Sequence, residues 1–309
     1  PNVHSNNADL PDWGAFVKTD LERLNAYKLM ALEHKEVIED ILAEAQIILA
    51  PTQLSTTAPL KLLARKHGFR AATMPGFTPA MIPALRIDYS EVYRRVNRIK
   101  NEVTRANALD IQFMVNRKDR CNVHFDLRYR GGHASGGRFP APGEAGNLPS
   151  GECYIVPYEG ELQETSCSEG VLPVQMEDEV VRYRIVQNKA VEVLSQGRVS
   201  DGEARRIIEE PAYANIAELG FGVLKDFGLG PVGVTLLDEK LGLHIAFGRS
   251  DHFGGAVGVK DFSSPEAVIH IDRIYISETA PRIQVESVRL AYPDGDTLDL
   301  MRDGRYTIF

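Results

Sequence analysis

Residues 243–275 constrain the fold more than any other part of this 309-residue chain. Within this segment, His270 and Asp272 alternate with two isoleucines. Because side chains on a β-strand point alternately to its two faces, the pattern predicts a strand that presents the imidazole and the carboxylate on one face. His244 has similar apolar neighbours. Two histidines and an aspartate on apolar strands indicate a metal site; the alternative is that each is a buried polar residue bonded to a backbone group.

The composition is that of a globular protein, with 43% hydrophobic and 25% charged residues. The length exceeds that of one typical core, so we expect two domains, residues 1–121 and 122–309. A net charge of -8 argues against a nucleic-acid partner. No apolar run approaches the roughly 18 residues that cross a bilayer, and the three cysteines lack C-x-x-C spacing. These features predict a cytoplasmic protein, away from membranes, that acts on a small-molecule or short-peptide substrate.

The first part of the chain alternates short apolar runs with helical periodicity. Helices are predicted over residues 20–46, 57–65 and 89–106, with strands at 47–51 and 69–74. Such alternation is typical of an α/β fold, so we expect an N-terminal doubly wound α/β domain with a mostly parallel sheet. It contains no G-x-G-x-x-G or P-loop sequence, and a nucleotide site is therefore not indicated.

The second part is predicted to be rich in β-strands. Half-buried strands begin near residue 111, a loop rich in glycine and proline spans 131–151, and a hairpin turns at 293–296. Glu218 lies in an apolar run with two glycines. Burial of a carboxylate without a partner costs on the order of several kcal/mol, so a cation should face it. An arginine or lysine satisfies that need as well as a metal ion does.

Five short motifs occur in a characteristic order: NLPSGE at 147–152, AELG at 217–220, DEK at 238–240, HIAFG at 244–248 and HID at 270–272. Together they resemble the catalytic half of the aminopeptidase T family, which are leucyl aminopeptidase-like metalloproteases of thermophilic and other bacteria. The resemblance implies a C-terminal catalytic domain of aminopeptidase T type and a homodimer. It also implies two divalent metal ions, zinc, cobalt or manganese, held by Glu152, Glu218, His244, His270 and Asp272.

A metal pair of this kind lowers the pKa of a shared water and makes hydroxide available near neutral pH. We therefore expect a metal-dependent hydrolase that cleaves an amide or peptide bond of a small substrate. Glu152 or Glu218 is the carboxylate that would handle the proton of the water, as a base or as a bridging ligand.

The chain departs from the family after the fourth motif, HIAFG. Family peptidases carry a tyrosine near the scissile carbonyl, whereas this chain has Asp251 and His252 at about that place. Asp251 is a candidate substrate-binding residue, and His252 is a candidate catalytic residue or simply a loop histidine. Arg128 and Arg138 are candidates for binding a substrate carboxylate, with loop salt bridges as the alternative.

A second function must be compared with the first, because the sequence also resembles the 2,5-dihydroxypyridine 5,6-dioxygenases of the same fold. These enzymes use one ferrous ion, retain the H-x-D pair and supply a histidine near the place of Glu218. Here His244, His270 and Asp272 offer the two imidazoles and one carboxylate of such sites. The alternative is thus a mononuclear Fe(II) enzyme that cleaves a hydroxylated pyridine or related aromatic ring. A metal-free binding protein is less favoured, since every expected ligand position is filled.

Overall fold

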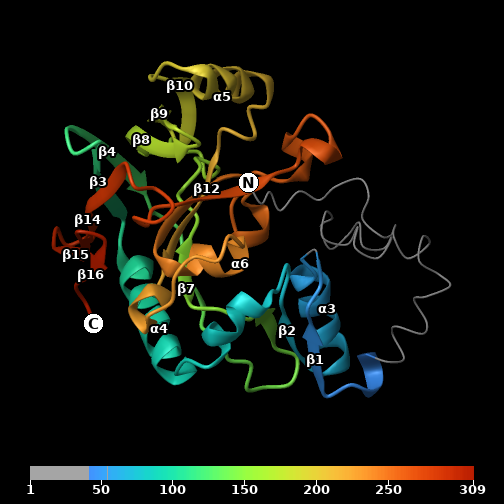
Figure 1. Cartoon of the computed structure of the whole chain (residues 1–309). Helices are drawn as coiled ribbons and strands as arrows, with labels where there is room; N and C mark the ends of the chain where they lie inside the picture. The colour runs from blue at the N-terminus through green and yellow to red at the C-terminus, as the bar shows by residue number, and fades with distance from the viewer. Residues whose placement is uncertain (1–41, 54) are drawn as a thin grey trace.

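The computed structural model describes residues 42–53 and 55–309, so most of the predicted helical segment at 20–46 lies outside it. These residues form a mixed α/β structure with three sheets and few helices (Figure 1). In chain order its strands and longer helices are β1 (Ile47–Ala50), α3 (Thr57–His67), β2 (Arg70–Thr73), α4 (Tyr89–Arg105), β3 (Ala108–Val115), β4 (Asp119–Asp126), β5 (His133–Ser135), β6 (Ala145–Asn147), β7 (Glu152–Ile155), β8 (Glu169–Met176), β9 (Glu179–Val186), β10 (Lys189–Val193), α5 (Arg198–Glu209), β11 (Ile216–Gly222), β12 (Leu243–Gly248), β13 (His270–Ile274), β14 (Ile283–Ala291), β15 (Thr297–Arg302) and β16 (Arg305–Tyr306).

The smallest sheet is parallel, with the strand order β1-β2-β6, and α3 packs beside it (Figure 1). Helix α3 stops where Gly68 adopts φ 80°, a left-handed conformation that glycine allows without steric cost. These elements share a core of their own, which includes Leu60, Ala64 and Phe69. Strand β6 comes from the loop predicted at 131–151, where three small or polar residues give little strand signal.

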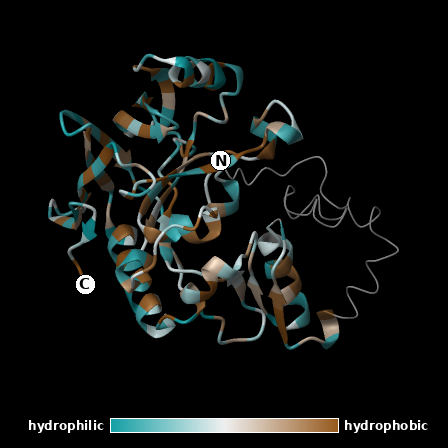
Figure 2. Cartoon of the chain, viewed as in Figure 1, coloured by the Kyte–Doolittle hydropathy of each residue, from teal (hydrophilic) through white to brown (hydrophobic). Residues whose placement is uncertain are grey.

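Helix α4 forms as predicted but packs against β5 and β7 of another sheet. Asp88 caps its N-terminus by accepting a hydrogen bond of 2.9 Å from the backbone N–H of Ser90. Its aliphatic residues, including Val96 and Ile99, are fully buried in the large core. Figure 2 shows hydrophobic and hydrophilic residues interspersed along this helix. The predicted domain boundary between residues 121 and 122 falls inside β4. The division into two domains stays a prediction.

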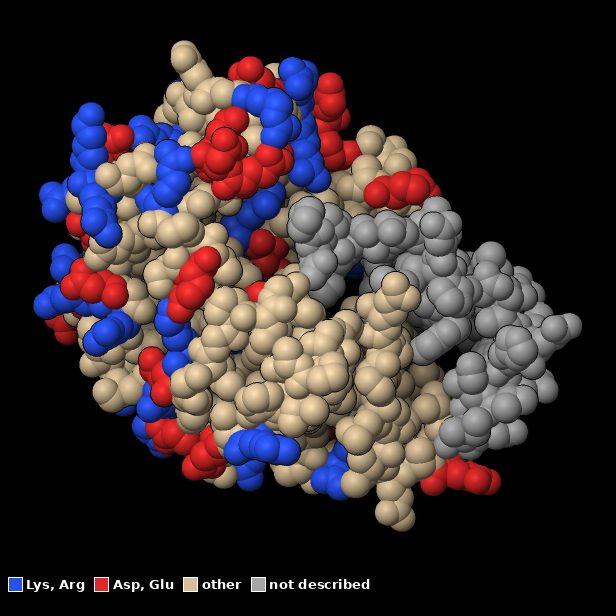
Figure 3. Space-filling model, viewed as in Figure 1, with Lys and Arg blue, Asp and Glu red and all other residues tan. Residues whose placement is uncertain are grey.

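The largest sheet has eight strands in the order β10-β9-β8-β4-β3-β14-β15-β16, and all of its pairs are antiparallel. The predicted hairpin at 293–296 is confirmed, because β14 pairs with β15 on either side of it. Acidic and basic side chains are interspersed over the face around α5 and β8 to β10 (Figure 3). Within the described ranges, no helix has the length and apolarity that crossing a bilayer requires.

The third sheet carries the predicted metal ligands. It has five antiparallel strands in the order β13-β12-β11-β7-β5. One of its faces contributes large apolar side chains to the main core, among them Leu219, Phe221 and Ile245. Because side chains alternate along a strand, the residues between these point to the opposite face. That opposite face holds the site.

Candidate metal centre

Strand register brings the five predicted ligands together on one face of the five-stranded sheet. Glu218 of β11 and Asp272 of β13 flank Ala246 of β12, the strand between them. His244 lies two residues before Ala246, and His270 lies two residues before Asp272, so both imidazoles leave the same face. Glu152, the first residue of β7, completes the group from the strand on the other side of β11.

Small residues opposite these ligands leave room for their side chains. Gly220 pairs directly with His244, and a Cβ on Gly220 would lie 1.8 Å from His244 Nε2. Gly248 pairs with His270 and has φ 104°, and a Cβ there would lie 2.2 Å from the carbonyl oxygen of Ile269. The glycines of the AELG and HIAFG motifs are therefore part of the cradle that holds the imidazoles.

The ligands form two groups that share Glu218. The inner triad consists of Glu152, Glu218 and His244, and all three are buried. His244 Nε2 lies 3.5 Å from a carboxylate oxygen of each glutamate and makes no hydrogen bond there. The outer triad consists of Glu218, His270 and Asp272 and is more accessible. His270 Nε2 lies 3.1 Å from Glu218 and 3.7 Å from Asp272.

Both imidazoles are oriented by backbone carbonyls. His270 Nδ1 lies 2.8 Å from the carbonyl oxygen of Arg249, and His244 Nδ1 lies 3.3 Å from that of Gly242. An N–H donated from Nδ1 leaves Nε2 of each ring pointing at the carboxylates. This is the arrangement by which metal-binding histidines are usually held. The unpaired, fully buried Nε2 of His244 and the convergence of carboxylates on both rings fit a cation.

The electrostatics of these side chains also favour a bound cation. Burial disfavours the charged form of Glu218, but its contacts with His244 and His270 outweigh this and lower its pKa to about 2. Burial likewise opposes protonation of His244, and Glu218 outweighs it, raising the pKa of His244 to about 9. The pKa of His270 is also raised. Protons on the imidazoles therefore balance the carboxylates, and a bound metal ion would displace them.

A lysine that was not predicted as a site residue touches the inner triad. Lys240 is fully buried, and its Nζ lies 3.2 Å from Glu152 and also contacts the side chain of Glu239. Lys240 and Glu239 belong to a short 3-10 helix, Glu239–Leu241, just before β12. The DEK motif contained this signal, because a buried carboxylate predicts a buried cation.

Aromatic side chains surround the accessible end of the site. His252 and Phe253 lie on a short 3-10 helix, and their rings make edge contacts with His270, at centroid distances of 5.2 and 5.4 Å. Tyr154 packs against Phe253 at 4.6 Å, and His133 stacks on Tyr154 at 5.2 Å. Burial lowers the pKa of His252 to about 4, against the opposing effect of Asp251. His252 is thus a neutral imidazole beside the outer triad.

The predicted substrate-binding residues have partners of their own. Asp251 accepts a hydrogen bond from Arg249, and its carboxylate lies 3.6 Å from His252 Nδ1. Arg128 is paired with the buried Asp126 at 2.8 Å, and the Arg138 guanidinium lies 5.4 Å from the ring centre of Tyr93. Asp251 therefore adjoins the site through His252, whereas the two arginines contact other parts of the fold. Their roles in substrate binding stay predictions.

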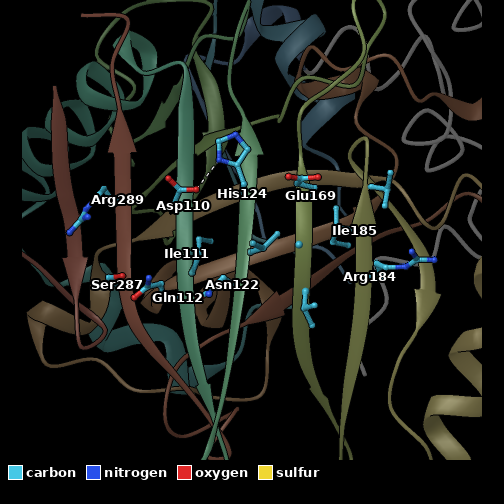
Figure 4. A pocket seen from close by; sticks show the side chains of 14 residues that line it. Asp110, Ile111, Gln112, Asn122, His124, Glu169, Arg184, Ile185, Ser287 and Arg289 are labelled. Atoms are coloured by element: carbon cyan, nitrogen blue, oxygen red, sulfur yellow. Dashed lines mark hydrogen bonds and ion pairs between the residues drawn. The ribbon is translucent and has the colours of Figure 1, made fainter. Parts of the chain in front are cut away.

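A separate hollow lies on the outer face of the eight-stranded sheet (Figure 4). Its volume is about 770 Å³, and its lining side chains come from β3, β4, β8, β9 and β14. Acidic and basic groups are mixed in it, and His124 pairs with Asp110 at 2.8 Å (Figure 4). None of the five predicted ligands lines it.

Comparison with known proteins shows that a solved structure has a similar fold. No family model matches the chain, and no curated protein matches its sequence. A solved structure of 2,5-dihydroxypyridine dioxygenase from Pseudomonas putida KT2440 is similar in fold, with a TM-score of 0.62. The alignment covers 90% of this chain and 76% of the dioxygenase chain, at 15% sequence identity.

This similarity corrects the prediction of an aminopeptidase-like metallohydrolase. The matched structure is a dioxygenase, and neither the hydrolase function nor membership of the aminopeptidase T family is supported. The predicted ligands are compatible with both chemistries, because imidazole and carboxylate bind zinc and iron alike. The motifs identified candidate ligands but assigned the wrong reaction.

Proposed function

We propose that this chain is a metal-dependent dioxygenase that cleaves a hydroxylated pyridine or a related aromatic ring. The observation that carries the proposal is the outer triad, on a fold similar to that of a 2,5-dihydroxypyridine dioxygenase. The cofactor is a single ferrous ion. Homodimerisation and a cytoplasmic location stay predictions.

In this proposal the outer triad holds the metal. Glu218 is fixed from β11, and His270 and Asp272 are fixed from β13, two residues apart on one strand face. One imidazole and two carboxylates form a donor set richer in oxygen than the common two-histidine, one-carboxylate iron site. Manganese, which also favours oxygen ligands, is therefore the appropriate comparison metal. When bound, ferrous iron supplies the one-electron chemistry that dioxygen needs.

The surrounding side chains suit a planar aromatic substrate. Phe253 and Tyr154 offer ring surfaces next to His270, and aromatic rings pack with one another in stacked or edge contacts. Asp251, which could bind a terminus of a short peptide, is already bonded to Arg249. The apolar edge of the site thus favours a ring over a dipeptide.

His252 is the residue we assign to proton transfer. Its imidazole is neutral at physiological pH, since burial lowers its pKa to about 4, and it lies against His270 at the open end of the outer triad. A neutral imidazole can accept the proton of a ring hydroxyl whose own pKa a bound metal would lower, and so favours the electron-rich anion that reacts with oxygen. Asp251, 3.6 Å from His252 Nδ1, orients the ring.

Oxygen consumption by metal-reconstituted protein tests the proposal. The chain is stripped with a chelator and loaded anaerobically with one equivalent of Fe(II), Mn(II) or Zn(II). We expect the iron-loaded protein to consume one equivalent of oxygen for each dihydroxypyridine ring that it opens, with ultraviolet absorbance of the ring lost in parallel. The zinc-loaded protein should be inactive, because zinc has no redox chemistry.

Two variants make the test specific. Glu218→Gln removes a charged ligand and should abolish iron binding and oxygen consumption together. His124→Gln removes a histidine from the distant hollow and should change neither. Oxygen consumption that is equal in the Glu218 variant and the natural chain would exclude the outer triad as the reaction site.

A further inference from the structure

The inner triad offers ligand atoms of the same types as the outer triad, so the chain presents room for two ions. Each residue of this triad, Glu152, Glu218 and His244, offers one ligand atom, and these atoms lie close enough together to bind one metal ion. Their side chains are at most 9% exposed. The residue that distinguishes the two triads is Lys240, whose ammonium contacts only the inner one.

Lys240 is fixed in place. Its side chain is completely buried, and its backbone presses against β11 so closely that a Cβ on Gly222 would lie 2.2 Å from the Lys240 carbonyl carbon. Gly222 also donates a backbone hydrogen bond of 2.9 Å to Gly242, just after the lysine. The backbone of Lys240 therefore cannot shift toward β11, and its buried ammonium stays beside Glu152. A buried ammonium must keep a carboxylate partner, and Glu152 is one of its two partners.

Glu152 is thereby committed to a cation that the chain itself provides. One of its oxygens faces Lys240 at 3.2 Å, and the other faces His244 at 3.5 Å. A divalent ion in the inner triad would share this carboxylate with an ammonium that cannot move away. Like charges that share one buried carboxylate repel strongly, because the interior screens them weakly. Within the described residues, the ion pairs of Glu218 are with His244 and His270, and none is with an ammonium.

We propose that Lys240 sets the metal stoichiometry of the site: its ammonium occupies, electrostatically, the place of a second ion and restricts the chain to one divalent metal in the outer triad. Glu152 and His244 then position Glu218 from the inner side without binding metal. This inference rests on the proposed function only in requiring that the outer triad binds a metal.

The number of bound ions tests the inference without any measurement of activity. Stripped full-length protein is titrated anaerobically with Mn(II), and separately with Fe(II), by calorimetry and by elemental analysis after gel filtration. We expect one equivalent in the natural chain and two in Lys240→Met, which keeps the length of the side chain and removes its charge. Lys225→Met, which removes a lysine from an exposed ion pair with Glu278, is the matched control and should bind one.

Glu152→Gln keeps the test decisive if Lys240→Met does not fold. Loss of a residue that only positions Glu218 should weaken binding of the single ion by about 10- to 100-fold, whereas loss of a true ligand should weaken it by well over about a hundredfold. Two equivalents in the natural chain, one in a folded Lys240→Met, or a loss well beyond about a hundredfold in Glu152→Gln would each overturn the role of Lys240. Failure of every protein to bind metal would instead overturn the proposed function, and the inference with it.

Discussion

At the scale of residues, the sequence identified the side chains that converge but not the groups that make their convergence possible. His270 and Asp272 were predictable because period-2 alternation places them on one strand face. The space beside His244 could not be predicted, because it depends on which strand pairs with β12 and on Gly220 lying opposite His244. The partner of Glu152 was also missed. A cation was predicted to face Glu218, and the sequence did not show which of its 35 lysines and arginines would pair with Glu152.

The ligand role of His270 leads to a direct prediction. His270→Ala removes the only imidazole of the outer triad. We expect its affinity for Mn(II) to fall at least a hundredfold, because one of three protein ligands is lost. Calorimetry measures the change, with His124→Ala as the control that replaces a histidine far from the site. Equal affinity in His270→Ala and the natural chain would remove His270 from the ligand set.

The close contact at Gly220 leads to a second prediction. Gly220→Ala places a methyl group where the His244 ring lies, so the strand or the ring must shift. We expect the free energy of unfolding in urea to fall by about 1–3 kcal/mol, as in other overpacked cores. Gly202→Ala is the matched control: it lies in α5 with open space around it and should be neutral or slightly stabilising. Equal stability of the two variants would show that the site tolerates the methyl group.

At the scale of elements, local patterns predicted the segments better than their neighbours. The helices at 57–65 and 89–106 and the final hairpin were expected and are present. Periodicity shows that a face of α4 is buried, but not against which sheet. The helix was assigned to the N-terminal sheet, and it packs instead on β5 and β7. Strand β6 joins a sheet whose other strands lie more than 70 residues earlier, a pairing without a local signal.

The pairing of β3 with β4 carries a pH-dependent interaction. Asp110 faces His124 across the two strands, and its hydrogen bond outweighs burial and raises the pKa of His124. A histidine with a raised folded-state pKa contributes stability that is complete below its unfolded pKa of about 6.5 and is lost as pH rises through the folded value. Asp110→Asn should therefore destabilise the chain at pH 5.5 more than at pH 8.5.

The expected size of this effect is small. Both side chains are more than a third exposed, so solvent screening limits the difference to about 0.5 kcal/mol. Urea unfolding of both proteins at both pH values measures it, and 1 M NaCl should reduce it further. An equal cost of Asp110→Asn at pH 5.5 and 8.5 would show that His124 does not gain its proton from this pair.

At the scale of the whole molecule, the motifs and the fold similarity favour different reactions. Five motifs in order favoured a hydrolase, but they identify ligands and do not specify what the metal does. The similarity to a dioxygenase over 90% of the chain favours the oxygenase. The reaction could not be predicted from the ligands, since imidazole and carboxylate bind zinc and iron alike. The proposed function therefore depends on the reaction itself, which labelled oxygen reports most directly.

That measurement is a single turnover of iron-loaded protein with a dihydroxypyridine under ¹⁸O₂, followed by mass spectrometry of the product. A ring-cleaving dioxygenase inserts both atoms of O₂ as the carbon–carbon bond breaks, so the account predicts a ring-opened product that carries two ¹⁸O atoms. A product whose added oxygen comes from water, or an intact ring after turnover with excess oxygen, would contradict it.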